Sequence, residues 1–186
     1  MTLRGQFALA TLCAFVLAAI AHLAAVLAIP YLAEKDAFSR LRSTLSADRS
    51  EIIAAPGDLG TWLPYPDPDV ALSTCAYTLE EGPVRVSART GALFQSVSLH
   101  ARAGGVFFAI TDRAAVRGAL DLVLMTRRQL DEALATEDPD EPSRDVRIVA
   151  PSREGLVVIR VLAAFPSQRE EASEVAKSVS CTIDRE

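Results

Sequence analysis

The chain has 186 residues, half of them apolar, with a mean hydropathy of +0.22 and a formal net charge of −5. This length is enough for one domain of ordinary size with an appendage. The acidic balance argues against nucleic acid as a partner, because no basic run carries the interleaved aromatic residues that such a surface needs.

The first element is an apolar segment over residues 7–29, which has 23 residues and no charged side chain. A helix needs about 20 such residues to cross a bilayer, whereas the apolar region of a secretory signal has about 7–15. We therefore predict that residues 1–29 form a cytoplasmic tail and an uncleaved transmembrane anchor. A cleaved signal peptide is the alternative. All 24 acidic and 18 of the 19 basic residues follow this segment.

Small residues recur along the predicted anchor at spacings of four and three, and His22 adds a polar group to the apolar segment. The stripe consists of Ala14, Ala18, Ala21, Ala25 and Ala28. Small residues allow transmembrane helices to approach closely, and a polar side chain in lipid is stabilised by a partner. This pattern predicts homo-oligomerisation through the anchor. The alternative is chance, because nine of the 23 residues are alanine.

Residues 30–53 are predicted to form an amphipathic stalk helix, because apolar side chains fall on one stripe. The stripe consists of Ala37, Phe38, Leu41 and Leu45. Residues 54–70 contain four prolines and two glycines, which predicts a loop. Trp62 and Tyr65 are expected to anchor this loop on the domain or at the bilayer surface.

Residues 54–186 are predicted to form a β-rich periplasmic domain. Apolar and polar residues alternate over 84–88 and 97–101, as in half-buried strands. Two glycines mark a hairpin into residues 106–111, which are apolar on both faces and are predicted to form a central strand. Further strands are expected on either side of the Gly82–Pro83 turn and at residues 119–125, 146–150 and 156–164.

Two capping boxes predict helices in this domain, one starting at Thr126 and extending to about Thr136, the other starting at Ser167 and extending to about Ser178. The strands follow one another without helical crossovers, which argues against a parallel doubly wound sheet. The sequence therefore predicts an α+β fold. Its core is a mostly antiparallel β-sheet or sandwich with two or three flanking helices, preceded by one N-terminal transmembrane helix.

The two cysteines of this domain, Cys75 and Cys181, are candidates for a disulfide. Neither lies in a metal-binding spacing, and only His100 could act as the base for a nucleophilic cysteine. Closing a loop of this length would stabilise the fold by about 4.7 kcal/mol in the chain-entropy model. Two unconnected buried thiols and a reactive cysteine are the alternatives.

The orientation of the anchor depends on this disulfide. Counting Lys and Arg residues favours a cytoplasmic C-terminal side, because only Arg4 precedes the anchor, whereas a very short tail followed by an apolar run is typical of an export signal. Disulfides persist in oxidising compartments. We therefore predict a single-pass protein of the inner membrane with its C-terminal domain in the periplasm.

Polar side chains on two predicted strands form a possible ligand face. It consists of Arg85, Arg89, Ser96, Ser98 and His100. If the two strands are neighbours and these side chains share a face, the patch could bind a small anion; the alternative is a solvated outer face. The Ser–His pair lacks a G-x-S-x-G elbow and an evident orienting acid, so we expect no hydrolase activity. No metal or cofactor site is expected.

Asp121 and Arg160 each interrupt an apolar strand. A charge is costly to bury unless it is paired, so the two residues are candidates for a buried ion pair. The alternative is that each side chain faces water on the outer side of a sheet.

Three segments, at residues 65–86, 94–116 and 120–134, resemble small membrane-anchored alphaproteobacterial proteins of the domain-of-unknown-function 1254 family. The shared pattern comprises a cysteine, a "DL..GPV" strand pair at residues 78–84 and an "F.A.TDR" strand at residues 107–113. Thr78 stands where the family has aspartate, which is a departure. The resemblance covers roughly residues 30–182. It implies an envelope location and a companion domain of the 1214 type, and it implies no reaction.

From these observations we expect a non-catalytic domain that interacts with another protein, for which the resemblance suggests a protein of the 1214 type. A small-anion-binding module is the first alternative, and a hydrolase is the second. An exposed apolar patch or an unpaired sheet edge would favour the interaction domain, whereas a deep concave pocket would favour the ligand-binding module.

Overall fold

The computed structural model describes residues 3–32, 37–42, 45, 48–58, 60, 61, 63–137 and 145–184. The chain separates into two units, Met1–Ser39 and Arg40–Glu186.

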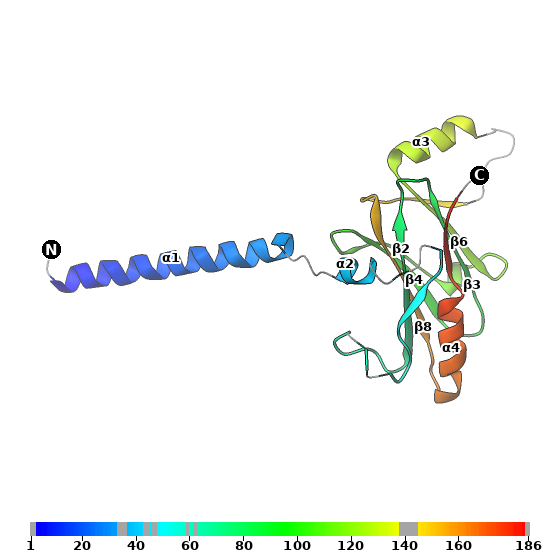
Figure 1. The fold of residues 1–186 in the computed structure, drawn as a ribbon, viewed down its shortest axis with the longest axis horizontal. Coiled ribbons are helices and arrows are strands. Elements are labelled where there is room, and N and C mark those ends of the chain that lie inside the picture. The colour runs from blue at the N-terminus through cyan, green and yellow to red at the C-terminus, as the bar shows by residue number, and fades with distance from the viewer. Residues whose placement is uncertain are drawn as a thin grey trace. The chain divides into compact units, whose positions relative to one another are not determined.

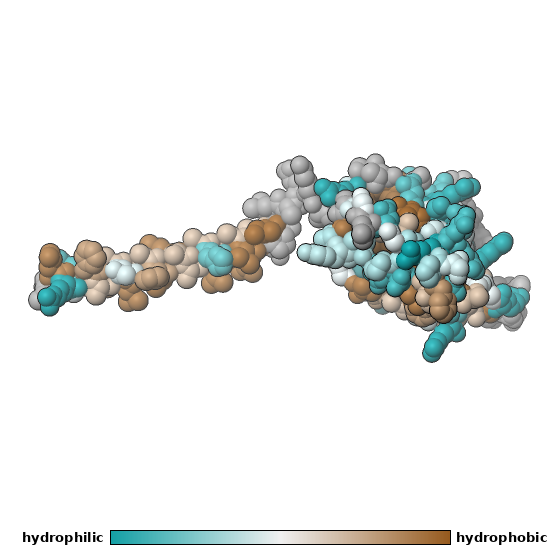
Figure 2. All heavy atoms as spheres, turned by 90° about the horizontal axis from the view of Figure 1, so that it is seen from below, coloured by the Kyte–Doolittle hydropathy of each residue, from teal (hydrophilic) through white to brown (hydrophobic). Residues whose placement is uncertain are grey.

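The main element of the first unit is the helix α1 (Leu3–Leu32). Its segment Leu3–Ile29 is long and apolar enough to cross a membrane, and it also has the features of a signal sequence. At 1.5 Å per residue these 27 residues extend over roughly 40 Å, more than the roughly 30 Å of a bilayer core. Figure 2 shows hydrophobic residues along most of α1. The predicted apolar helix is therefore present and begins four residues earlier than expected.

The predicted stalk helix over 30–53 is only partly described. A short helix, α2 (Ala37–Arg42), falls within it. The prediction is wrong for its last residues, because strand β1 (Glu51–Ala54) belongs to a sheet and Arg49 forms a β-bridge with Ser180. The β-branched pair Ile52 and Ile53 favours a strand where the sheet offers an edge.

The second unit contains two sheets (Figure 1). The five-stranded sheet is antiparallel throughout, in the order β1, β2 (Val70–Thr78), β8 (Glu154–Leu162), β4 (Gln95–Ala101) and β5 (Val106–Thr111). The four-stranded sheet has the order β7 (Val146–Val149), β6 (Ala119–Met125), β3 (Val84–Arg89) and β9 (Ser180–Ile183), with one parallel pair, β6 and β7.

The helices α3 (Arg127–Thr136) and α4 (Arg169–Lys177) complete this unit, together with the short 3-10 segments η1 (Asp112–Ala114) and η2 (Pro166–Gln168). α4 packs against β1, β2 and β8, and Figure 1 shows it in orange to red beside the sheets. The predicted α+β fold, with mostly antiparallel sheets in a sandwich-like arrangement, is thus confirmed.

Alternate residues of both sheets form one hydrophobic core. The residues of the core cluster on β3 are Val84, Val86 and Ala88, and those on β8 are Val157, Ile159 and Val161. Ala172 and Ala176 of α4 belong to the same core. Because side chains on a strand alternate between faces, polar residues between them point outward, among them Arg85 and Arg89 on β3 and Arg160 on β8.

The prediction that residues 106–111 form a central strand is wrong, because β5 lies at the edge of the five-stranded sheet. Phe107, Phe108 and Ile110 are partly buried against the core, while Val106 is 56% exposed. Local apolarity could not distinguish burial by two neighbouring strands from partial burial at an edge.

Two features of the turns also differ from the predictions. The strands on either side of Gly82 belong to different sheets, so this turn leads from one sheet to the other instead of closing a hairpin. Ser167 lies within η2 and does not cap α4. Pro166, whose fixed φ suits a first helical position, starts this helical segment one residue earlier, and the Phe165 N–H donates to Gln168 Oε1. The capping box predicted at Thr126 is confirmed.

Candidate functional site

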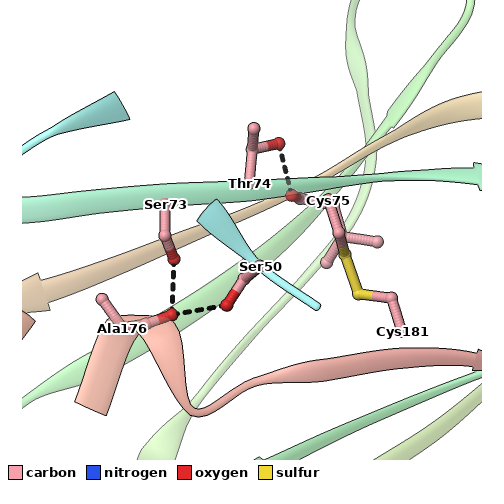
Figure 3. Close-up of a disulfide and its surroundings, with 7 residues drawn as sticks. Ser50, Ser73, Thr74, Cys75, Ala176 and Cys181 are labelled. Carbon is pink, nitrogen blue, oxygen red and sulfur yellow. Dashed lines mark hydrogen bonds between the residues drawn. A yellow bond between two sulfur atoms is a disulfide. The ribbon is translucent and has the colours of Figure 1, made fainter. Parts of the chain in front are cut away.

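The sulfur atoms of Cys75 and Cys181 lie at disulfide-bonding distance, as predicted (Figure 3). Cys75 lies on β2 and Cys181 on β9, so the disulfide joins the two sheets. Their Cα atoms are 6.6 Å apart, and both residues are buried. This bond is enclosed in the core, where a reductant or a substrate has no access to it, so its role is structural.

Buried hydroxyl groups beside the disulfide hold α4 to the five-stranded sheet. The carbonyl oxygen of Ala176 accepts hydrogen bonds of 2.7 Å from both Ser50 and Ser73 (Figure 3). This carbonyl belongs to the last turn of α4, where carbonyl groups have no partner within the helix. The Thr74 hydroxyl donates to the carbonyl of Val157 at 2.7 Å. These hydrogen bonds remove the cost of burying polar groups next to the core.

Arg85, predicted to lie on a ligand face, is instead held by two carboxylates. Its Nη1 and Nη2 donate to Asp145 at 3.1 and 2.8 Å, and its Nε and Nη2 donate to Asp184 at 3.3 and 3.1 Å. The hydrogen bonds to Asp145 are the largest of the effects that raise the pKa of Arg85. This cluster joins β3 to the residues that flank β7 and β9, so Arg85 is a structural residue.

The predicted five-residue ligand face is wrong as a single surface, because its two strands belong to different sheets. Arg85 and Arg89 lie on β3, whereas Ser96, Ser98 and His100 lie on β4, which pairs with β5 and β8. Arg89 is exposed on the four-stranded sheet. A strand is locally the same whichever sheet it joins, so the alternation pattern could not reveal this separation.

The predicted ion pair between Asp121 and Arg160 is also wrong. Asp121 is exposed on the four-stranded sheet, where its Oδ1 accepts a hydrogen bond of 2.6 Å from Ser87. Arg160 is exposed on the five-stranded sheet. The alternative stated for this pair, that each charge faces water on its own sheet, is the arrangement observed. Burial of an ion pair would cost more than this solvation.

The arginine that lies next to Ser98 and His100 is Arg160 of β8. The sequence had suggested the arginines of β3 for this position. Arg160 Nη1 donates to Ser98 Oγ at 3.2 Å, and Ser98 Oγ lies 3.1 Å from His100 Nε2. Ser98 Oγ also lies 3.3 Å from the carbonyl oxygen of Val158. Burial, with a smaller effect from the charge of Arg160, lowers the pKa of His100 below its ordinary value. The imidazole is therefore neutral at pH 7.

The register of the sheet explains this cluster. Arg160 pairs with Ser96 on β4 and with Leu72 on β2, so its side chain emerges between these two strands on the outer face. Ser98 lies two residues along β4 on the same face, within reach of the guanidinium. The sequence did indicate Arg160, as a charged residue within an apolar strand. The residues beside it could be identified only once the pairing of β8 with β4 and β2 was known.

A pocket of about 220 Å³ opens on the other side of Arg160. Three elements form its walls: β1, β2 and the proline-rich loop between them. The lining residues are Ala54, Leu63, Pro64, Tyr65, Pro66, Asp67, Val70, Leu72 and Arg160. Tyr65 is 99% exposed, so it does not anchor the loop on the domain; Trp62 lies outside the described residues. The lining is mainly apolar and contains one cation, Arg160, and one carboxylate, Asp67.

Among the described residues, no three His, Cys, Asp or Glu side chains are grouped so as to hold a metal ion. The alanine stripe and His22 lie on α1, and the structure does not test the oligomerisation predicted from them. Thr11, also on α1, donates its hydroxyl to the Phe7 carbonyl at 2.9 Å, so this polar group is satisfied within the helix.

No protein-family model matches the chain, and no curated protein matches it. Among solved structures, the VPA0106 protein of Vibrio parahaemolyticus is similar, with a TM-score of 0.51 and 9% identity over 83% of this chain. An uncharacterised protein from Burkholderia cenocepacia has a TM-score of 0.46 and 11% identity over 75% of this chain. This chain spans only 33% and 36% of the lengths of those two proteins. The likeness to the Vibrio protein concerns the fold alone.

Proposed function

We propose that this chain is a single-pass protein of the inner membrane whose periplasmic domain is a non-catalytic module that binds another protein. Three observations support the proposal: an N-terminal helix of membrane-spanning length, a cysteine pair that suits an oxidising compartment, and an unprotected sheet edge. The sheet edge carries the interaction part of the proposal.

The unprotected edge is β5, with the sequence VFFAIT. In the part of the chain that the structure describes, β5 pairs with β4 alone. Proteins usually protect such an edge with lysine, proline or a very short strand. β5 has six residues and neither a charge nor a proline, and both Val106 and Ala109 are exposed. Its one irregularity is a register shift against β4 between Leu99 and His100. Its free backbone groups can therefore pair with an added strand.

The partner that we propose is a companion protein of the 1214 type that adds an extended strand to β5. The resemblance to the 1254 family implies such a companion, either on the same chain or as a separate protein. In VPA0106 the fold shared with this chain occupies 33% of a longer chain. In VPA0106 this fold is thus followed or preceded by other parts of the same chain, which is consistent with a domain that works next to a second domain.

The geometry of Ser98 supports a binding role over hydrolysis. A nucleophilic serine must present its oxygen to a substrate with a base at hand. Ser98 is 6% exposed, and its oxygen accepts a hydrogen bond from Arg160. The hydroxyl group is thus buried, and one of its lone pairs already accepts a hydrogen bond. The Ser98–His100 contact is better explained as support for Arg160 than as a catalytic pair.

Affinity purification of the tagged full-length chain from its native membrane, after cross-linking, tests the interaction. The double variant Val106→Lys with Ala109→Lys places charges on the β5 edge. The matched control is Leu134→Lys with Ala135→Lys, which makes the same kind of change at exposed positions of α3. We expect a 1214-type protein with the wild type and the control, and at least tenfold less with the β5 variant. Equal recovery with all three, or recovery of this chain alone, would overturn the proposal.

The orientation can be tested separately with a single cysteine at an exposed site. Leu134→Cys in a Cys13→Ala background places a thiol on α3, away from the disulfide. A membrane-impermeant maleimide should label this cysteine in intact spheroplasts. Labelling only after lysis would place the domain in the cytoplasm and would refute the periplasmic assignment.

A further inference from the structure

The pocket beside Arg160 has the composition of a binding site for a small amphiphilic anion. Its walls are carbon-rich, formed by Leu63, Pro64 and Pro66 of the loop and by Val70 and Leu72 of β2. Small-molecule sites are typically apolar cavities with a few polar groups that fix the orientation of the ligand. Here Arg160 is the cationic group of the lining, which also contains Asp67.

Arg160 is held in place by its neighbours and keeps donors available. One nitrogen, Nη1, donates to Ser98 Oγ at 3.2 Å, and Ser98 is in turn close to His100 Nε2 at 3.1 Å. A guanidinium has five N–H donors in a planar fork. Among the described residues, no carboxylate forms a salt bridge with Arg160, in contrast to Arg85 with its two aspartates. The positive charge of Arg160 is therefore available to a ligand.

Asp67 is the acidic residue in the pocket lining, and its carboxylate is engaged locally. Its Oδ1 accepts a hydrogen bond of 3.0 Å from the N–H of Asp69 within its own turn. This hydrogen bond holds the carboxylate in the turn, so that Asp67 shapes the loop. Arg160 is thus the charged residue of the lining that can donate hydrogen bonds to an anion.

We propose that this pocket binds a small carboxylate with a short apolar tail, its carboxylate on the guanidinium of Arg160 and its tail against the loop and β2. A carboxylate matches the guanidinium because two of its oxygens can accept parallel hydrogen bonds. The volume of 220 Å³ indicates how much of a ligand the pocket can hold. At about 30 Å³ per water-sized group, the pocket holds roughly seven or eight non-hydrogen atoms. Hexanoate has this size.

The site is distinct from the β5 edge and from the proposed protein partner. It uses Arg160, whereas the sequence had suggested the arginines of β3, and it adds the apolar walls, which no strand pattern predicted. The proposal therefore does not depend on the interaction through β5, and variants of Val106 and Ala109 should leave it unchanged.

Isothermal titration of the full-length chain in lipid nanodiscs tests the proposal, with empty nanodiscs as the blank. The probes are hexanoate, its uncharged analogue hexanamide, and acetate, which has the charge without the tail. We expect saturable binding of hexanoate, with hexanamide and acetate each at least tenfold weaker. Equal affinity for hexanamide would refute recognition of the charge, and equal affinity for acetate would refute a role for the apolar walls.

The decisive variant is Arg160→Gln, with Arg89→Gln as the matched control. Both changes remove one exposed arginine from an outer sheet face, and only Arg160 lines the pocket. We expect Arg160→Gln to weaken hexanoate binding at least tenfold and Arg89→Gln to leave it within twofold. Unchanged binding by Arg160→Gln would overturn the proposal, as would an equal loss in both variants. Thermal melting of each variant confirms that it is folded.

Discussion

Removing the disulfide between Cys75 and Cys181 should reduce the free energy of unfolding of the domain more than any other single change discussed here. The two cysteines are separated by 106 residues, and the bond connects β2 of one sheet with β9 of the other. Without it, the unfolded chain regains the conformational freedom that closure of this long loop removes. The perturbation consists of Cys75→Ala, Cys181→Ala and the double variant.

The magnitude follows from the length of the loop and from the burial of the sulfur atoms. The chain-entropy model gives about 4.7 kcal/mol for a loop of this length. Cys75 and Cys181 are 0% and 2% exposed. Truncation of each to alanine therefore adds about 0.5–1.5 kcal/mol, the usual cost of removing one buried heavy atom. Each single variant should lose about 5–6 kcal/mol, and the double variant only about 1 kcal/mol more.

Urea denaturation of the full-length chain in detergent measures these losses, with the Cys13→Ala variant as a control that leaves the bond intact. The single losses should be strongly non-additive, because either substitution alone breaks the same bond. If a single variant does not fold, wild-type protein equilibrated in urea with and without reductant gives the same difference. Thiol titration of the denatured protein should find one free thiol before reduction and three after it.

Additive losses of about 1 kcal/mol for each single variant would mean that the cysteines are merely neighbouring buried thiols. Three free thiols before reduction would lead to the same conclusion. Either result would also remove the main support for an oxidising compartment.

Three further predictions concern the sheets. A Cβ at Gly155 would meet the His100 carbonyl oxygen and the Tyr77 hydroxyl, so Gly155→Ala should cost about 3 kcal/mol in urea denaturation, and Tyr77→Phe should restore only part of it. Arg85→Met should cost about 1–3 kcal/mol at pH 7, because it removes the hydrogen bonds and ion pairs that Arg85 forms with two partly buried carboxylates, whereas Arg89→Met should stay within about 0.5 kcal/mol. Equal losses would refute the structural role of Arg85. The pKa of His100 is lower in the folded protein than in the unfolded chain, so as the pH falls below 6.5 the unfolded chain binds a proton before the folded protein does. The wild type should therefore lose stability in this pH range relative to His100→Gln. Parallel stability curves between about pH 5 and pH 8 would contradict this assignment.

Much of the secondary structure could be predicted from the sequence, because its causes are local. The apolar run of residues 7–29 favours a helix of membrane-spanning length, and β6 (Ala119–Met125) was predicted with the same bounds that the structure has. The α3 capping box depends on groups three residues apart, Thr126 and Gln129, and it was found where the sequence placed it. Each of these features depends on neighbours within a few residues.

The candidate site was predictable only in part. Ser98 and His100 share a face of one strand, so their proximity follows from the strand period of two. Which arginine joins them depends on which strand pairs with β4, and the alternation of β3 and β8 gives no information on that choice. The same limit explains why β5 was predicted to be central.

The sequence by itself therefore determined most of the elements in this protein and the sides on which their polar residues lie, because these follow from short-range periodicity. It did not determine the edge strand β1, where a helix was predicted. Only the tertiary structure decided that Cys75 meets Cys181, that Arg85 is held by two aspartates, and that Arg160 stands beside an apolar pocket. These contacts join residues far apart in the chain. They arise from the pairing of strands into two sheets, which is selected by the packing of the whole core.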